Sequence, residues 1–219
     1  LHYPLRRQRQ MCIRDSINPT SNASATNFLV ESISAGVTVL YANTTSSGTA
    51  VLLNDLNTLA VSEFFVVGGA AWSIDSSLGT YLLVAESVDD YLISLPIAWW
   101  SDGDNPAIQL ARAIHAENLR PENQLDTGYL LGLGAADLGR EALGAAIDRS
   151  GSANVKGEDV LEQLAVLEDY AVMGGLYTLD YTAGNRSPTF LQLWQVSNSL
   201  DWVPLGTGGE IPDFTVDDD

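Results

Sequence analysis

The chain has 219 residues, enough for one well-packed α/β domain or most of two small lobes. It carries 28 Asp and Glu against 10 Lys and Arg, and a net charge of −18 disfavours nucleic acid and anionic lipid as partners. With one cysteine and two histidines we expect no transition-metal site and no cofactor, and no run of about 18 apolar residues could span a membrane.

Residues 1–16 differ in character from everything that follows. The segment RRQRQMCIRDS, residues 6–16, back-translates in one reading frame to adapter DNA used to prepare sequencing libraries, so we interpret 1–16 as an artefact. The alternative is a basic arm or the start of a signal peptide, but residues 17–27 (INPTSNASATN) are not the apolar segment that a signal peptide requires. We therefore expect the natural sequence to begin near Ile17, with an upstream part and its export signal missing.

Residues 28–98 alternate between helical and strand patterns. A helix ends at Gly36, strands are predicted at 37–42, 64–67 and 91–98, and helices lie between them at 49–59 and 76–85. The first two strands are short and apolar, which is typical of strands buried on both faces. Pro96 places the third near a sheet edge or a strand end. This alternation predicts a parallel sheet whose carboxyl edge binds ligands.

The rest of the chain is predicted to be mainly helical before it returns to strands. Helices are expected at 106–118, capped by Asn105, at 126–148 and at 157–170. Strands are expected at 176–181 and 190–196, and residues 202–204 are expected to close the ordered part. Small residues such as Gly132 and Gly139 predict that the long helix approaches a neighbour closely. His115 is expected to be exposed or to cap its helix.

Three stretches carry a resemblance to a known family. They are the strand end 40–43 (LYAN) with the Gly-rich loop 67–71 (VGGAA), the apolar-Pro strand 92–96 followed by 99–106, and the series 128–129, 157–160, 170–175, 185–186 and 190–196. In this order they resemble the C-terminal part of a type I periplasmic solute-binding protein of the branched-chain amino acid group, which serves ABC importers.

The resemblance implies a periplasmic-binding-protein type I fold, with one doubly wound parallel-sheet lobe nearly complete, part of a second lobe, and the N-terminal portion missing. Residues 17–102 would form the second-lobe α/β segment, and 103–180 a helical segment returning to the first lobe. Residues 181–205 would be strands crossing back to the second lobe, and 206–219 an acidic tail.

The resemblance also implies a ligand held between the lobes, and we predict that it contacts Tyr41, Asn43, Thr44, Trp72 and Ser73. Capping of a turn by the first three, and packing between lobes by Trp72, are the alternatives. Trp99 and Trp100 are expected to pack at the hinge between the lobes. Amino-acid-binding members hold the ligand's ammonium with an acid in the Gly-rich loop. Here that position holds alanine, with Asp75 further on, so a standard branched-chain amino acid is disfavoured. Trp72 suggests an apolar, aromatic or cationic ligand group.

The predicted function is that of an extracytoplasmic solute-binding component of an ABC importer, periplasmic or extracellular, with or without a lipid anchor. It would bind a small polar or amino-acid-like ligand, deliver it to permease subunits and catalyse nothing. The alternatives are a sensor or receptor domain of the same fold and, less favoured, an α/β enzyme. For an enzyme the chain lacks G-x-S-x-G, and the loop aspartates Asp75, Asp102 and Asp104 are better explained as solvated side chains.

Overall fold

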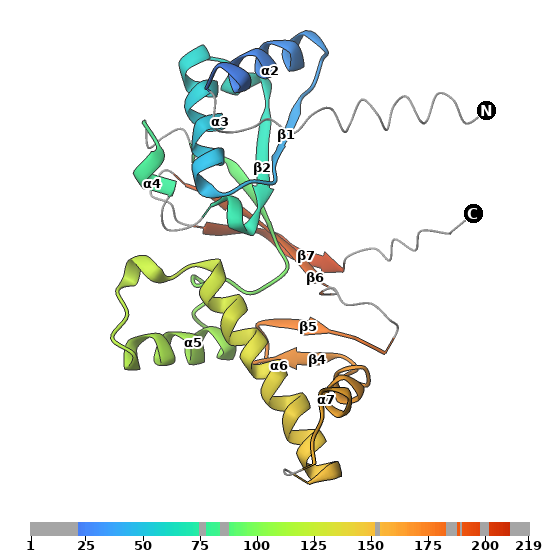
Figure 1. The fold of residues 1–219 in the computed structure, drawn as a ribbon. Helices are drawn as coiled ribbons and strands as arrows, with labels where there is room; N and C mark the ends of the chain where they lie inside the picture. Colours follow the sequence, from blue (N-terminus) through green and yellow to red (C-terminus); the bar gives the residue numbers. More distant parts are fainter. Residues whose placement is uncertain are drawn as a thin grey trace, which may run out of the picture.

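The computed structural model describes residues 22–74, 78–83, 88–151, 154–182, 188, 190–197 and 202–210. The interpretation of residues 1–16 falls outside this part of the chain. Two bodies lie one above the other in Figure 1, joined by chain segments that cross between them. The upper body holds the larger sheet, and the lower body holds a helical layer with a small β-hairpin.

The upper body contains a five-stranded sheet with the order β1-β2-β3-β6-β7. The first three strands are parallel, whereas β6 and β7 are antiparallel to their neighbours. The predicted α/β class with a mainly parallel lobe is therefore confirmed. Its elements are α2 (Asn22–Ser34), β1 (Val39–Ala42), α3 (Ser46–Leu59), β2 (Val66–Ala70), α4 (Leu78–Tyr81), β3 (Tyr91–Leu95), β6 (Phe190–Val196) and β7 (Trp202–Glu210), with 3₁₀ turns at Ser62–Phe64 and Ala71–Ser73.

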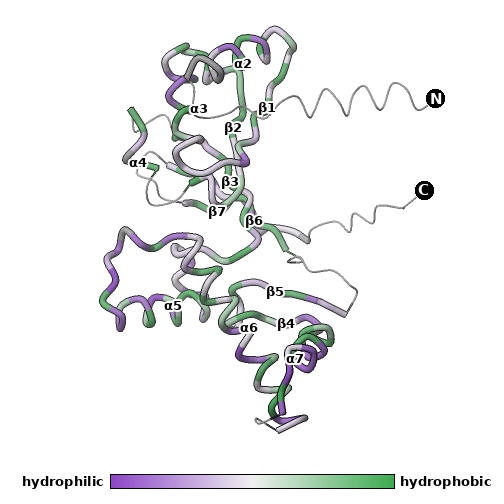
Figure 2. The backbone as a smooth tube through the Cα atoms, in the orientation of Figure 1, coloured by the Kyte–Doolittle hydropathy of each residue, from purple (hydrophilic) through white to green (hydrophobic). Residues whose placement is uncertain are grey.

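The buried face of this sheet forms the core of the upper body. Leu40, Val67, Ile93 and Trp194 follow one another across four strands on this face. Leu29 of α2 and Leu56 of α3 belong to the same apolar cluster. The strands are among the hydrophobic stretches of the backbone in Figure 2. Burial of these side chains holds the two helices against the sheet.

The opposite face is open among the described residues. Val39 is 62% exposed, Tyr41 61% and Val66 51%, so the prediction that the first two strands are buried on both faces is wrong. Leu193 and Leu205, paired on β6 and β7, continue the exposed surface. Helices α2 and α3 pack on the buried face of β1 and β2. Because successive side chains of a strand point to opposite faces, every second side chain of β1 is left exposed.

The structure refines three further strand predictions. The second strand begins at Val66 rather than at residue 64, because Ser62–Phe64 forms a 3₁₀ turn. The third strand is central, with hydrogen-bonded neighbours on both sides, so it is not an edge strand. Pro96 instead follows its last residue, in agreement with the predicted strand end. β7 continues through residues 206–210, which had been expected to belong to the tail.

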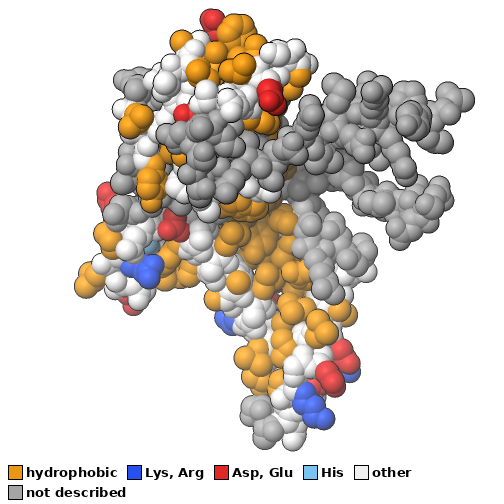
Figure 3. Space-filling model, turned by 45° about the horizontal axis from the view of Figure 1, so that its top comes forward, with side chains coloured by type: hydrophobic (Ala, Val, Ile, Leu, Met, Phe, Trp, Pro, Cys, Tyr) orange, Lys and Arg blue, Asp and Glu red, His pale blue; other side chains and the backbone are white. Residues whose placement is uncertain are grey.

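The lower body contains three helices and a hairpin. They are α5 (Pro106–Glu117), α6 (Thr127–Ser150), α7 (Gly157–Leu164), β4 (Tyr170–Val172) and β5 (Tyr177–Leu179). The predicted cap is confirmed, since Asn105 Oδ1 accepts from the backbone N–H groups of Ala107 and Ile108. The predicted helix 157–170 is too long, because Tyr170 already pairs with Leu179 in the hairpin. Charged side chains gather at the far end of this body, where Arg149 lies 2.7 Å from Glu162 (Figure 3).

The glycines of α6 do not all have the packing role predicted for them. Gly132 and Gly139 have open space where a Cβ would lie, so that prediction is wrong for them. Gly134 is the closely approached position, since a Cβ there would lie 2.9 Å from the hydroxyl oxygen of Tyr177. The hairpin, and not another helix, therefore requires a small residue on α6.

Asp137 ties the hairpin to α6. Its Oδ2 accepts from the Tyr170 hydroxyl at 2.9 Å and the Met173 backbone N–H at 2.7 Å, while Oδ1 accepts from Arg140 at 2.9 Å. Burial raises the pKa of Asp137, but these hydrogen bonds to the ionised carboxylate outweigh burial, and the pKa is lowered overall.

We expect this carboxylate to make stability depend on pH. Because the pKa of Asp137 is lower in the folded state, its contribution is complete above the unfolded pKa near 3.8 and disappears as the pH falls through the folded value. Urea unfolding of Asp137→Asn at pH 7 should show a loss of about 1–2 kcal/mol, and the variant should lose less of its remaining stability between pH 5 and pH 3. The exposed Asp148 on the same helix provides the control variant Asp148→Asn, and equal losses in the two variants would contradict this role.

Candidate functional site

The carboxyl ends of β1, β2 and β3 lie at one edge of the upper sheet because the three strands are parallel. This edge meets the start of α6, where the Thr127 hydroxyl donates to the backbone oxygen of Ala71 at 3.3 Å. The loops after β1 and β2, which hold the predicted ligand residues, therefore lie where the two bodies meet. We call Tyr41, Asn43, Thr44 and Trp72 the strand-end set.

Tyr41 lies near the end of β1 and its side chain extends across the open face of the sheet. Its hydroxyl is 3.1 Å from Ser94 Oγ on β3, so the side chain passes over β2. Gly68 makes this possible, since it pairs with Tyr41 on one side and Leu92 on the other and has no side chain in the way. The phenol is 61% exposed and remains accessible to a ligand.

Asn43 and Thr44 follow β1 directly. Asn43 is exposed and Thr44 is half-buried, and neither side chain makes a hydrogen bond in the described part of the chain. The N-cap of α3 is the next residue, Thr45, with an extended backbone (φ −73°, ψ 167°). Asn43 and Thr44 therefore do not cap the turn, which was the alternative role for them.

Trp72 and Ser73 lie in the 3₁₀ turn after β2 but differ in exposure. Trp72 is 54% exposed, whereas Ser73 is fully buried. The Ser73 hydroxyl donates to the backbone oxygen of Ala70 at 2.5 Å and lies 3.0 Å from the hydroxyl of Tyr91. Burial raises the pKa of that phenol to about 12, so Tyr91 stays neutral. Ser73 therefore stabilises the turn from the interior of the upper body, and its side chain is not exposed at the surface as that of Trp72 is.

The strand-end set contains no acidic and no basic side chain. Asp75, the acid nearest to the Gly-rich loop in sequence, lies outside the described residues. The side chains that are placed at this edge offer hydroxyl and amide groups and an indole face. They suit hydrogen bonding to an uncharged group and contact with carbon or a cation.

Tryptophan packing joins the two bodies, as predicted. We call residues 96–105, which lead from β3 to α5, the crossing segment. Its Trp99 stacks on Trp202 of β7 with ring centroids 3.6 Å apart and planes inclined by 9°. Trp100 is also buried, and its indole N–H donates to the backbone oxygen of Asp126 at 3.1 Å. His115 is 5% exposed and packs edge-on against Trp100 and Tyr129, so the expectation that it is exposed or capping is wrong.

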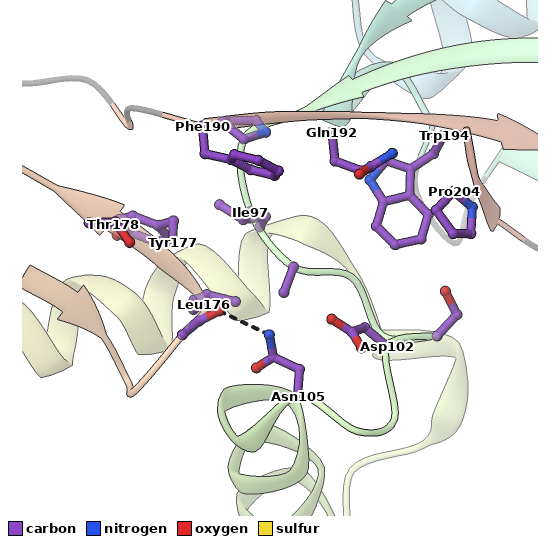
Figure 4. Close-up of a pocket in the computed structure, with 14 residues that line it drawn as sticks. Ile97, Asp102, Asn105, Leu176, Tyr177, Thr178, Phe190, Gln192, Trp194 and Pro204 are labelled. Atoms are coloured by element: carbon purple, nitrogen blue, oxygen red, sulfur yellow. Dashed lines mark hydrogen bonds between the residues drawn. The ribbon is translucent and has the colours of Figure 1, made fainter. Parts of the chain in front are cut away.

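A concavity that the sequence did not indicate lies between the bodies beside the crossing segment (Figure 4). This hinge cleft has a volume of about 460 Å³. Its wall comes from β6, β7, the crossing segment, the start of α5 and the start of β5. It is lined by residues 96–98, 101–102, 105, 175–178, 190, 192, 194 and 204. None of the five predicted ligand residues lines it.

Within the described residues, no group of three or more His, Cys, Asp or Glu side chains could hold a metal ion. Every helix in the same ranges is too short or too polar to cross a lipid bilayer.

No protein-family model and no curated protein matches the chain. Solved structures of similar shape are numerous. A branched-chain amino acid ABC transporter protein from Thermus thermophilus with bound valine superposes with a TM-score of 0.67 at 19% identity, over 85% of this chain and 49% of that one. An ABC transporter substrate-binding protein from Aeropyrum pernix gives 0.70 at 16% identity, over 89% and 50%. A fatty acid ABC transporter substrate-binding protein from Thermomonospora curvata gives 0.69 at 20%, over 89% and 49%.

The chain therefore has the type I solute-binding fold. The expected fold is confirmed, and the chain spans about half the length of the solved structures it matches.

Proposed function

We propose that this chain is part of the extracytoplasmic solute-binding component of an ABC importer. Its role would be to bind a small ligand and present it to permease subunits, without catalysis. The observation that carries the proposal is the type I solute-binding fold together with the strand-end set at the carboxyl edge of its parallel sheet. Three of these four side chains are exposed and the fourth, Thr44, is half-buried.

The strand-end set favours a ligand that contacts it through an uncharged group. Of the similar structures, one contains valine and another is named for fatty acids, so ligands of very different polarity occur within this fold. An unpaired ammonium buried between the bodies would be costly, and the strand-end set has no carboxylate to pair with it. Amide and hydroxyl groups of a neutral ligand can instead bond to Tyr41, Asn43 and Thr44, with Trp72 against its carbon atoms.

Titration of the protein with N-acetylvalinamide, valine and octanoate, followed by calorimetry, tests this proposal. We expect the neutral amide to bind more tightly than valine, and Trp72→Ala to weaken its binding at least about tenfold. Phe64→Ala is the matched control, because Phe64 is a similarly exposed aromatic residue at the amino end of β2. Equal losses in the two variants, or tighter binding of valine, would count against the strand-end site.

A further inference from the structure

The hinge cleft is separate from the strand-end set and has its own chemical character. Its volume of about 460 Å³ lies within the range of small-molecule sites in proteins. Chain segments far apart in sequence build it, namely the crossing segment, the start of β5, and strands β6 and β7. Both bodies contribute, so a molecule bound there would contact both of them.

One wall of the cleft is aromatic and apolar. The Trp194 indole extends from β6 toward the centre of the cleft in Figure 4, and Phe190 lies further along the same strand. Trp194 is 5% exposed and Phe190 42%, so the first is held firmly by its surroundings while the second is accessible. Ile97 on the crossing segment adds apolar surface. Such a wall can pack against apolar groups of a ligand, and its aromatic rings also attract cations.

The facing wall carries one charge. Among the described residues that line the cleft, Asp102 is the only acidic or basic one, and Figure 4 shows its carboxylate directed into the space below Trp194. Within the described residues this carboxylate accepts no hydrogen bond and forms no ion pair. Arg112, a nearby cation on α5, donates to the backbone oxygen of Trp100 and lies over that indole ring.

Three other polar side chains of the cleft, those of Asn105, Gln192 and Ser101, already make hydrogen bonds. Asn105 uses its carbonyl oxygen to cap α5 and its amide to donate to Gly175, so the backbone N–H groups that start the helix are not free to attract an anion. Gln192 donates to the backbone oxygens of Leu193 and Leu205, and Ser101 to that of Trp202. The Asp102 carboxylate thus has no partner within the described residues and lies opposite an aromatic wall, in which the buried indole N–H of Trp194 is also unbonded.

We propose that the hinge cleft is a binding site for a small organic cation, with its ammonium group at Asp102 and its carbon body against Trp194 and Phe190. A carboxylate and an aromatic face attract the same charge, so a cation satisfies both walls at once. An anion is repelled by Asp102, and a neutral molecule would leave the carboxylate unpaired while covering it. The proposal does not rest on the strand-end site, since the two share no residue.

Benzyltrimethylammonium, the neutral benzyl alcohol and the anion benzoate are the probes, titrated into the 219-residue protein with binding followed by calorimetry. We expect saturable binding of the cation with a dissociation constant at or below about 1 mM, weaker binding of the alcohol and none of benzoate. Asp102→Asn should weaken binding of the cation at least about tenfold and leave the alcohol unchanged.

Asp104→Asn is the matched control, because this exposed aspartate of the same loop does not line the cleft and its replacement changes the net charge equally. It should alter the affinity less than about twofold. Phe190→Leu, a change at a half-exposed position, should weaken binding of the cation more than binding of the alcohol. The proposal is overturned if the cation shows no saturable binding, if benzoate binds as well, or if the two aspartate variants behave alike. Trp72→Ala should leave this binding intact, which separates the result from a failure of the strand-end site.

Discussion

Replacing Gly69 with alanine is expected to destabilise the protein by about 3 kcal/mol, the upper end of the cost of overpacking. A Cβ at this position would collide with the Tyr91 hydroxyl, and would lie 2.5 Å from the backbone oxygen of Ala42 and from Ser73 Oγ. The Ala42 oxygen belongs to the neighbouring strand and cannot move without disturbing the pairing of β1 with β2. The added methyl group would thus separate the two strands at the edge that carries the strand-end set.

Urea unfolding followed by circular dichroism measures the effect. Gly144→Ala is the control, because Gly144 lies inside α6 and has nothing within 4 Å of an added Cβ. There alanine should stabilise the protein by about 0.5–1 kcal/mol, since glycine is a poor residue inside a helix. A Gly69→Ala variant as stable as the wild type would mean that β1 and β2 are not packed as described.

Replacing Trp202 with alanine should cost about 3–5 kcal/mol, the usual range for a buried tryptophan. Trp202 is 6% exposed and stacks on Trp99, so the pair connects β7 to the crossing segment. The truncation removes the buried ring and leaves Trp99 facing a cavity. The loss should appear in thermal and in urea unfolding.

Trp72→Ala serves as the comparison for Trp202→Ala. Trp72 is 54% exposed, so its removal should change the unfolding free energy by no more than about 0.5 kcal/mol. If the two variants were equally stable, the Trp99–Trp202 stack would not hold the bodies together. If both were equally destabilised, Trp72 would be a packing residue, the alternative role considered from the sequence.

Local patterns were sufficient to predict many elements of this chain. The Asn105-Pro106 step determines where α5 begins, because the asparagine caps the first free N–H groups and proline suits the first turn. Alternation of strand and helix patterns between residues 28 and 98 predicted a parallel sheet, and it placed the strand-end set at one edge. These features depend on neighbours in sequence, so they can be recognised without the structure.

Which strand faces are covered could not be decided in this way. The apolar strands β1 and β2 suggested burial on both sides, but α2 and α3 lie on one face and leave Val39 and Val66 exposed. The end of α7 was misplaced for a similar reason, since pairing of Tyr170 with Leu179 in the hairpin takes that residue out of the helical pattern. Contacts between separate elements overrode local preference in both cases.

The hinge cleft is entirely a product of tertiary structure. From the sequence, Asp102 is predicted to be one of several solvated aspartates, and Trp194 is predicted to be an ordinary apolar residue of a strand. Only the crossing of the chain between the bodies brings them to the same cavity, where the carboxylate has no partner among the described residues. The sequence by itself determined the order of the main elements and the cap of α5, because these depend on short-range patterns. The folded chain decided the open sheet face, the buried His115 and the hinge cleft, because each depends on which distant residues meet in space.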